Sequence, residues 1–200
     1  MIVNPLTPQE VLDIFADAGG LLKGHFLLTS GLHSDTYLEK FQVLQHPKHT
    51  ERLCAELARR FADEGVDVVV GPVTGGIILA YEVARQLGAR AIFTEREDGV
   101  MCLRRGFAIN PGEKVLVVED IVTTGGSVKE VLAVLEKTPG QIAGVGLLID
   151  RSGGKVDFGV RTEALLQLDI EVWQPSDCPL CRANVPITKR GSRQIANEPH

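Results

Sequence analysis

An order of elements that recurs along the chain constrains the fold more than any other feature. An apolar strand at Val66–Val70 leads into a glycine-rich turn at Gly71–Gly76 and then into a helix. The same order returns with a strand at Lys114–Val118, a turn at Glu119–Ser127 and a helix at Val128–Lys137. Strands that alternate with helices form parallel sheets covered by helices on both faces. The sequence therefore predicts an α/β fold.

Local signals predict the remaining elements. The segment TPQE at residues 7–10 is a capping box with proline at the first helical position, so a helix should run to about Ala18. Residues 24–40 alternate apolar and polar side chains, which is typical of a hairpin or a bent pair of strands. Apolar residues recur every four positions over Pro47–Glu64, which predicts an amphipathic helix. A further buried strand is expected at Ile142–Ile149.

Length and composition favour one domain over residues 1–200. The chain has 200 residues, of which 44% are apolar, and this is enough for one buried core. Its apolar stretches are far shorter than the roughly 18 to 20 residues of a membrane span, and residues 1–20 lack the pattern of a secretory leader. The net charge of −5 argues against broad binding to nucleic acid. We therefore expect a cytoplasmic protein that binds neither membranes nor nucleic acid.

The segment VLVVEDIVTTGGS at residues 115–127 is the most informative motif. Its strand delivers Glu119 and Asp120 to the edge of the sheet where ligands usually bind. The turn then supplies hydroxyl groups, glycines and free helix-start amides from Thr123, Thr124, Gly125, Gly126 and Ser127. Carboxylates accept hydrogen bonds from ribose hydroxyls, while such amides hold a phosphate. The motif favours a sugar phosphate as ligand; the alternative is a helix cap beside a solvated acidic turn.

The turn GPVTGG at residues 71–76 also follows a strand and precedes a helix. The amides of Val73, Thr74, Gly75 and Gly76 are therefore further candidates for binding an anion. By itself this pattern is weak, and a plain turn before a helix is the alternative. The chain has no GxxxxGK[ST] pattern and no GxGxxG that opens a helix after a strand, which argues against nucleotide-triphosphate and dinucleotide sites.

The motif at residues 115–127 closely resembles the phosphoribosyl pyrophosphate signature of the type I phosphoribosyltransferases, in which apolar residues precede two acids and a Thr/Gly-rich turn. The segment GHFLLTSGLHSDTY at residues 24–37 resembles the N-terminal hood of the orotate phosphoribosyltransferases, which purine-directed relatives generally lack. This resemblance implies a type I phosphoribosyltransferase fold, with a parallel sheet flanked by helices over about residues 47–175. A small hood would come from about residues 1–40 and the C-terminal tail.

The resemblance also implies roles for the motif residues. Glu119 and Asp120 would face the ribose hydroxyls, residues 123–127 would hold the 5-phosphate, and residues 73–76 would grip pyrophosphate. The implied activity is transfer of the phosphoribosyl group from phosphoribosyl pyrophosphate to orotate, which gives orotidine 5'-monophosphate in pyrimidine biosynthesis. Mg²⁺ is the implied cofactor, bound mainly through substrate oxygens and water, so no protein metal ligand is expected. Members of the family are usually homodimers.

At the base end, the resemblance places Thr29 and Ser30 near pyrophosphate and base, and the backbone at Tyr37 and Leu38 against the orotate ring. It places Arg151 against the base carboxylate, and a guanidinium suits a planar carboxylate because it donates two parallel hydrogen bonds. A plain structural hairpin and an exposed surface arginine are the alternatives. Two rival functions also stay open: a phosphoribosyltransferase for another base, such as a purine, and a regulatory protein that senses phosphoribosyl pyrophosphate.

The chain departs from the family pattern at residues 93–107, which read FTEREDGVMCLRRGF and lack the usual lysines and histidine of a mobile loop. Arg96, Arg104 and Arg105 are the cations left there to neutralise pyrophosphate, so we assign them as catalytic beside the two acids. We expect residues 94–103 to form a mobile loop that closes over the site and excludes water. Gly75 and Thr29 also stand where better-known members have lysine.

The tail from Cys178 onward shows no clear periodicity, and we expect it to be mostly irregular. Cys178 and Cys181 have the spacing of half a zinc site. Completing that site requires Cys54, Cys102, a histidine or a neighbouring subunit. We therefore favour a metal-free tail.

Overall fold

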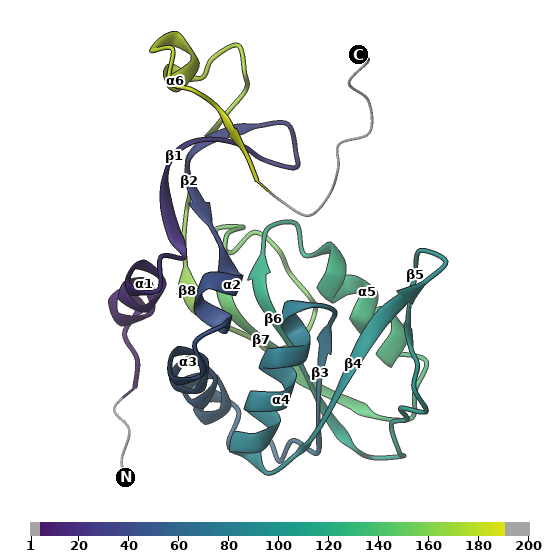
Figure 1. The fold of residues 1–200 in the computed structure, drawn as a ribbon. Coiled ribbons are helices and arrows are strands. Elements are labelled where there is room, and N and C mark those ends of the chain that lie inside the picture. Colours follow the sequence, from purple (N-terminus) through teal and green to yellow (C-terminus); the bar gives the residue numbers. More distant parts are fainter. Residues whose placement is uncertain (1–4, 191–200) are drawn as a thin grey trace.

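The computed structural model describes residues 5–190, in which two β-sheets are joined by helices and loops (Figure 1). The larger sheet consists of β3 Val68–Pro72, β4 Arg90–Glu97, β5 Val100–Leu103, β6 Lys114–Val122, β7 Gln141–Asp150 and β8 Thr162–Gln167. Its strand order is β5-β4-β3-β6-β7-β8, and every neighbouring pair is parallel except β4 and β5. This arrangement confirms the predicted α/β fold and adds an antiparallel edge strand.

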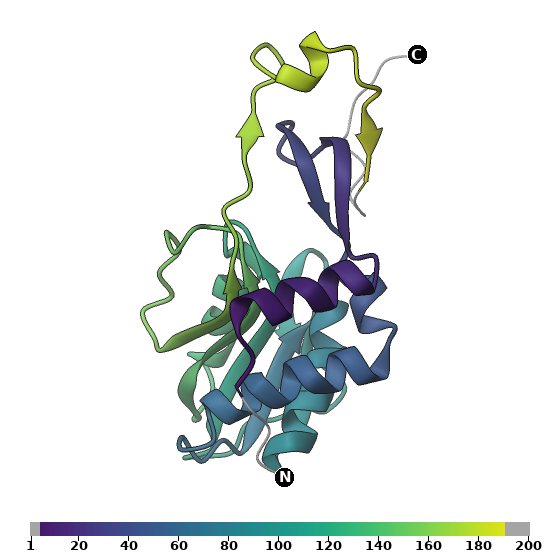
Figure 2. The same cartoon turned by 90° about the vertical axis from the view of Figure 1, so that its left-hand side faces the viewer.

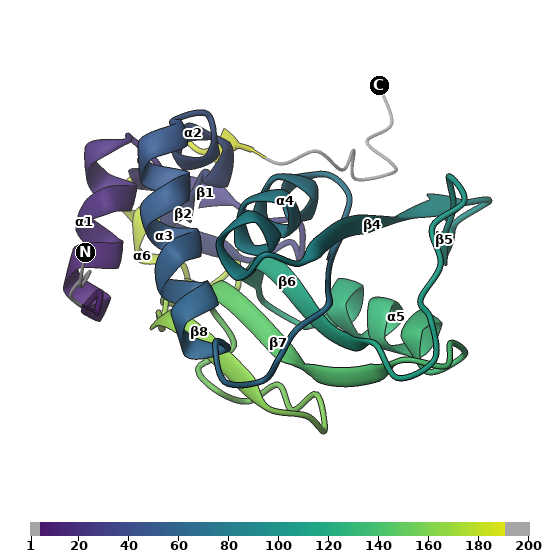
Figure 3. The same ribbon diagram turned by 90° about the horizontal axis from the view of Figure 1, so that it is seen from below.

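Helices cover both faces of the larger sheet (Figure 3). The helices are α1 Pro8–Asp17, α2 Lys40–Leu44, α3 Pro47–Arg60, α4 Gly75–Leu87, α5 Gly126–Leu135 and α6 Pro179–Arg182. α3 and α4 pack on one face and α5 on the other. Among the described residues, none of these helices combines the length and the apolar character needed to cross a membrane.

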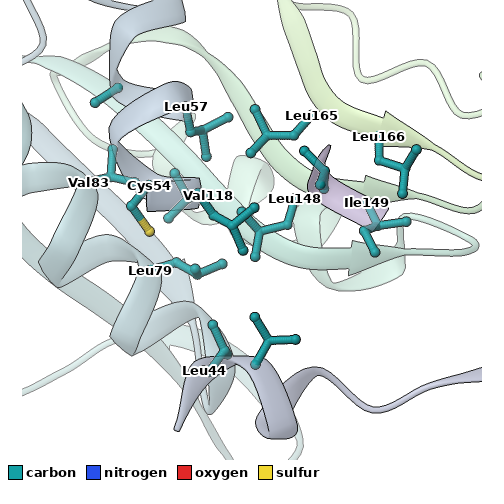
Figure 4. Close-up of a cluster of buried hydrophobic side chains, with 14 of the residues drawn as sticks. Leu44, Cys54, Leu57, Leu79, Val83, Val118, Leu148, Ile149, Leu165 and Leu166 are labelled. Atoms are coloured by element: carbon teal, nitrogen blue, oxygen red, sulfur yellow. The ribbon is translucent and has the colours of Figure 1, made fainter. Parts of the chain in front are cut away.

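Strand β6 shows how one sheet separates two buried clusters. Leu116 and Val118 face α3 and α4, whereas Val115 and Val117 face α5, because successive side chains of a strand point to opposite faces. All four are buried, which explains why the strand reads as a continuous apolar run. Figure 4 shows the first cluster, where leucine and valine side chains from α3, α4 and the strands meet.

The second sheet has the order β10-β1-β2-β9 and projects from one end of the larger sheet (Figures 1 and 2). Its strands are β1 Leu21–Leu27, β2 His33–Leu38, β9 Val172–Trp173 and β10 Thr188–Lys189. β1 and β2 form the predicted antiparallel hairpin, β9 pairs with β2, and β10 runs parallel to β1. We use the word hood for this sheet together with α6. Segments from both halves of the chain thus build one sheet.

Three elements differ from the sequence-based expectations. Residues 94–103, expected to form a mobile loop that closes over the site, instead form the antiparallel hairpin of β4 and β5, with Asp98 and Gly99 at positive φ in its two-residue turn. β6 continues to Val122, so both acids of the motif are strand residues. The tail contains α6 and β10, although it is otherwise irregular. By contrast, the capping box at Thr7 is present as predicted.

Candidate active site

The two acids at the end of β6 point to opposite sides of the strand. Glu119 borders a cavity of about 280 Å³ beside α5, and Asp120 borders a cavity of about 740 Å³ beside the hood. The two cavities adjoin, because Ile121, Thr123 and Thr124 line both of them. The sequence motif therefore supplies one carboxylate to each of the two cavities that adjoin at residues 121–124.

Both carboxyl groups are buried, and this changes their protonation. Burial, together with the negative charge of Asp120, raises the pKa of Glu119 to about 8. Burial also raises the pKa of Asp120, while Lys40 opposes the shift. Lys40 Nζ lies 2.9 Å from Oδ1 and 2.8 Å from Oδ2 of Asp120. The site thus holds acidic groups that hydroxyl donors or a cation would help to ionise.

The turn after β6 leaves backbone amides available for an anion. α5 begins after Gly125, whose φ of +74° lies in the left-handed region, and this N-cap has no side-chain hydrogen bond. A Cβ at Gly125 would come within 2.6 Å of Val156 and 3.0 Å of Phe158, so glycine is required there. The predicted residues Thr123, Thr124, Gly125, Gly126 and Ser127 all line the smaller cavity. The structure does not support the alternative in which a side chain simply caps this helix.

The turn at residues 73–76 lies directly against Asp120. A Cβ at Gly75 would overlap the Asp120 carboxylate, and a Cβ at Gly71 would overlap the backbone of Gly76. The lysine that better-known members have in place of Gly75 therefore has no room in this conformation. α4 starts after Thr74 without a side-chain cap, so its first amides are available. Val73 and Thr74 are exposed, Gly75 and Gly76 are buried, and none of the four borders either cavity.

The larger cavity has the residues expected at the base end. Thr29 and Ser30, in the turn between β1 and β2, line it together with Tyr37 and Leu38 of β2. Arg151, directly after β7, lines it from the opposite sheet, and its backbone N–H donates to the Val122 carbonyl at 2.7 Å. Arg151 Nε is buried and has no hydrogen-bond partner among residues 5–190. The cavity is therefore lined by an arginine whose Nε donor is not satisfied by the described residues.

Arg96 on the β4–β5 hairpin, and Arg104 and Arg105 directly after it, are paired with acidic side chains; we call these three residues the hairpin arginines. Arg96 lines the smaller cavity and forms an ion pair with Glu130 of α5. Arg105 donates two hydrogen bonds to Glu95, at 2.9 and 3.1 Å, and Arg104 pairs with Glu97 at 3.1 Å. Arg104 and Arg105 border neither cavity in the described chain. The structure thus brings Arg96 to the site but not the other two.

Lys40 is a site residue that sequence reasoning missed. It is the first residue of α2, directly after the base-end strand β2, and its ammonium reaches Asp120 eighty positions further along the chain. The sequence holds only a weak signal for this, a lysine two residues after Leu38 and three after the segment at residues 24–37 that resembles the hood. Lys40 connects the hood side of the cavity with the acids of the larger sheet.

Comparisons with known proteins agree with this geometry. Residues 41–158 match the family model described as "Phosphoribosyl transferase domain". The chain is 57% identical over 187 residues to an orotate phosphoribosyltransferase of Desulforamulus reducens, covering 94% of this chain and 98% of the relative. It is also 57% identical over 190 residues to one of Pelotomaculum thermopropionicum, covering 95% and 100%.

Solved structures extend the comparison to the fold. The structure of orotate phosphoribosyltransferase from Aeropyrum pernix aligns with a TM-score of 0.64 at 24% identity, over 79% of this chain and 93% of that one. An adenine phosphoribosyltransferase from Thermoanaerobacter pseudethanolicus aligns with a TM-score of 0.58 at 16% identity, over 66% and 88%. From the motif at β6, the fold and these relatives together, it follows that the chain belongs to the phosphoribosyltransferase family, in its orotate phosphoribosyltransferase branch.

Proposed function

We propose that this protein transfers the phosphoribosyl group from phosphoribosyl pyrophosphate to orotate, giving orotidine 5'-monophosphate and pyrophosphate in pyrimidine biosynthesis. The observation that supports this most directly is Arg151. Arg151 lines a cavity of about 740 Å³ that Asp120, Thr123 and Thr124 also line, and its buried Nε has no hydrogen-bond partner among residues 5–190. A guanidinium in that state matches a planar carboxylate, which orotate has and the purine bases lack.

The phosphoribosyl end binds around the end of β6. The amides and hydroxyls of residues 123–127 hold the 5-phosphate at the uncapped start of α5. The ribose lies across the end of the strand, where its hydroxyls donate to Glu119 and Asp120 from either side. Such hydrogen bonds favour the ionised carboxylates, so substrate binding lowers the raised pKa of Glu119. The amides of residues 73–76, beside Asp120, hold the pyrophosphate.

In the reaction, a ring nitrogen of orotate loses its proton to solvent and forms a bond to the anomeric carbon, while the bond from that carbon to the pyrophosphate oxygen breaks. Positive charge develops on the ribose in the transition state, and the buried acids stabilise it. Negative charge develops on pyrophosphate, and the amides of residues 73–76 stabilise that charge. Arg151 and the backbone at Tyr37 and Leu38 orient the base for attack.

The residues present fit a hydrated Mg²⁺ that is bound mainly through substrate oxygens and water. Glu119 and Asp120 are adjacent buried carboxyl groups whose pKa values are raised, so a nearby cation offsets the cost of ionising both. When bound, the ion offsets the charge on the departing pyrophosphate. Lys40 provides a fixed positive charge against Asp120 from within the chain.

Arg104 and Arg105 act, in our proposal, on the pyrophosphate of a neighbouring subunit in a homodimer. They are exposed and border neither cavity of their own chain, so we assign them to the site of a second copy of the chain. We further propose one functional unit over residues 1–200, with the hood acting on the base bound at the larger sheet. The cytoplasm is the proposed location, which agrees with four cysteines that are all free thiols.

The test is to mix purified protein, Mg²⁺ and phosphoribosyl pyrophosphate with orotate and to follow orotate absorbance, with adenine and hypoxanthine run in parallel. Turnover of orotate alone supports the proposal. Turnover of a purine in preference to orotate would contradict the proposal and identify that purine as the substrate. Binding of phosphoribosyl pyrophosphate without turnover of any base would instead favour a sensing protein.

A further inference from the structure

Two histidines and two cysteines meet at the far end of the hood, away from the cavities described above. His25 lies on β1, His33 on β2, Cys178 at the N-cap of α6 and Cys181 within α6. Their side-chain donor atoms, one from each residue, all lie within 4.8 Å of one another. Residues separated by about 150 positions therefore place two imidazole nitrogens and two sulfur atoms around one point.

The separations between these atoms fit one tetrahedral zinc ion. Zn–S bonds of about 2.3 Å and Zn–N bonds of about 2.0 to 2.1 Å require ligand atoms roughly 3.3 to 3.8 Å apart. His25 Nε2 lies 3.5 Å from Cys178 Sγ and 3.7 Å from Cys181 Sγ. His33 Nδ1 lies 3.3 Å from Cys181 Sγ and 2.9 Å from His25 Nε2. Three of these four separations lie in the range that the ion requires, the fourth is shorter by a few tenths of an ångström, and all six pairwise separations lie within 4.8 Å.

The cluster also has the surroundings of a structural metal site. His25 Nδ1 lies 2.8 Å from the Val185 carbonyl oxygen, and a hydrogen bond donated to that oxygen leaves Nε2 with its lone pair toward the cluster. His25, His33 and Cys178 are only 3%, 6% and 0% exposed, and Cys181 is partly buried. With four protein ligands, no coordination position is left for water or substrate, which is the pattern of structural zinc sites.

The segment around α6 has few other interactions that would hold it against the β1–β2 hairpin. α6 has four residues, none of them buried, and β9 and β10 have two residues each. Among residues 5–190, none of the four clustered residues belongs to either buried apolar cluster. Short elements without an apolar core are commonly held by a metal or a disulfide.

We propose that His25, His33, Cys178 and Cys181 bind one structural zinc ion that fastens the segment around α6 to the β1–β2 hairpin. This replaces the metal-free tail expected from the sequence. On binding, each thiol loses its proton to solvent and the histidines bind as neutral imidazoles, with no change in oxidation state. Because β2 continues from His33 to Tyr37 and Leu38, the ion also fixes one wall of the larger cavity. The proposal is independent of which base the protein uses.

The test measures metal in the full-length protein, prepared without an affinity tag, in the presence of reductant and zinc, and then dialysed. Elemental analysis should find about one zinc per chain. The double variant Cys178→Ser/Cys181→Ser should contain at least about ten-fold less zinc per chain than the unaltered protein. Two matched controls, Cys102→Ser and His46→Ala, change residues outside the cluster and should keep it. Replacing zinc by Co²⁺ in the unaltered protein should give the visible absorption of tetrahedral cobalt bound to thiolate.

The cobalt spectrum and zinc content of the unaltered protein decide the question even where the double variant folds poorly. Absence of zinc together with no thiolate-type cobalt spectrum would overturn the proposal. So would zinc content that is the same in the double variant as in the controls, or a Cys178–Cys181 disulfide in protein isolated without reductant. Limited proteolysis gives a second readout, because zinc removal by a chelator should expose the segment after Cys178 to cleavage while the larger sheet stays resistant.

Discussion

Arg151 and the hairpin arginines differ in what their guanidinium groups contact. Arg151 lines the larger cavity and its buried Nε has no partner among residues 5–190, whereas Arg105 makes two hydrogen bonds to Glu95 on the surface. Burial lowers the pKa of Arg151, while the pairing with Glu95 raises that of Arg105. One guanidinium is ready for an anionic ligand, and the other already has one. Residue type alone did not distinguish them.

The largest effect on activity should come from replacing Asp120, a buried acid of the site. Asp120→Asn should lower kcat by about 1000-fold while the fold stays intact, because the buried carboxylate next to the ribose site loses its charge. Steady-state orotate consumption and circular dichroism measure the two properties. The exposed Asp17→Asn is the matched control. Near-normal turnover of Asp120→Asn would remove the acidic pair from the mechanism.

Arg151→Met directly tests the role of the arginine that lines the larger cavity. The variant should lower kcat/KM for orotate by roughly 100-fold, because the base carboxylate would meet no buried cation. Binding of phosphoribosyl pyrophosphate, measured by calorimetry, should change little. Arg52→Met, which removes an exposed arginine paired with Glu10, should leave both values unchanged. Equal losses for orotate and phosphoribosyl pyrophosphate would place Arg151 outside base recognition.

The double variant Arg104→Ala/Arg105→Ala tests the hairpin side. It should lower kcat/KM for phosphoribosyl pyrophosphate by about 10-fold, which is less than the effect at Arg151 because the hairpin arginines are exposed to solvent. A loss larger than that of Arg151→Met would reverse the comparison.

Mixing this variant with Asp120→Asn then tests whether Arg104 and Arg105 act on the site of their own chain or on that of the partner. Each mixed dimer would have one site with both an intact cavity and an intact neighbouring hairpin. When the two variants are mixed in equal amounts, half of the randomly formed dimers are mixed, and each has one active site out of two. Activity should therefore return to about a quarter of that of the unaltered protein. No recovery in confirmed mixed dimers would contradict the proposal that the hairpin serves the partner's site.

The smallest effect is on stability and depends on pH. The pKa of Glu119 is raised from its ordinary value of 4.5 to about 8, so the fold favours the neutral carboxyl group. The stability that this contributes is full below about pH 4.5 and is lost as pH rises through about 8. Glu119→Gln keeps the group neutral, so the ligand-free variant should melt a few degrees above the unaltered protein at pH 9 and lose this advantage near pH 5. Glu136→Gln, at an exposed position, should melt like the unaltered protein at both pH values.

The sequence predicted what depends on local pattern. The apolar run of β6, the glycine turn at Gly125 and the capping box at Thr7 each occupy a few consecutive residues, and each is present in the structure. The Asp98-Gly99 pair was also a local hairpin signal, but its segment was interpreted through the family's mobile loop. The roles of individual site residues stay predictions.

Other features could not be predicted because they depend on distant contacts. Lys40 meets Asp120 only after α2 has packed beside the larger sheet. His25 lies about 150 residues before Cys178, and nothing in the spacing of either residue identifies the other. The opposite directions of Glu119 and Asp120 follow from the alternation of a strand, but the sequence placed both acids in the turn.

The strand order of the hood has a consequence for the time at which the protein becomes active during synthesis. β1 lies between β2, which is next to it in the chain, and β10, which contributes Thr188 and Lys189 opposite Phe26 and Leu27. Contacts between such distant segments close large loops and form slowly. β1 and β2 pair locally and can form early, whereas β9 and β10 join them only after β8 of the larger sheet has been made. The hood is therefore the last sheet of the protein to be completed during synthesis.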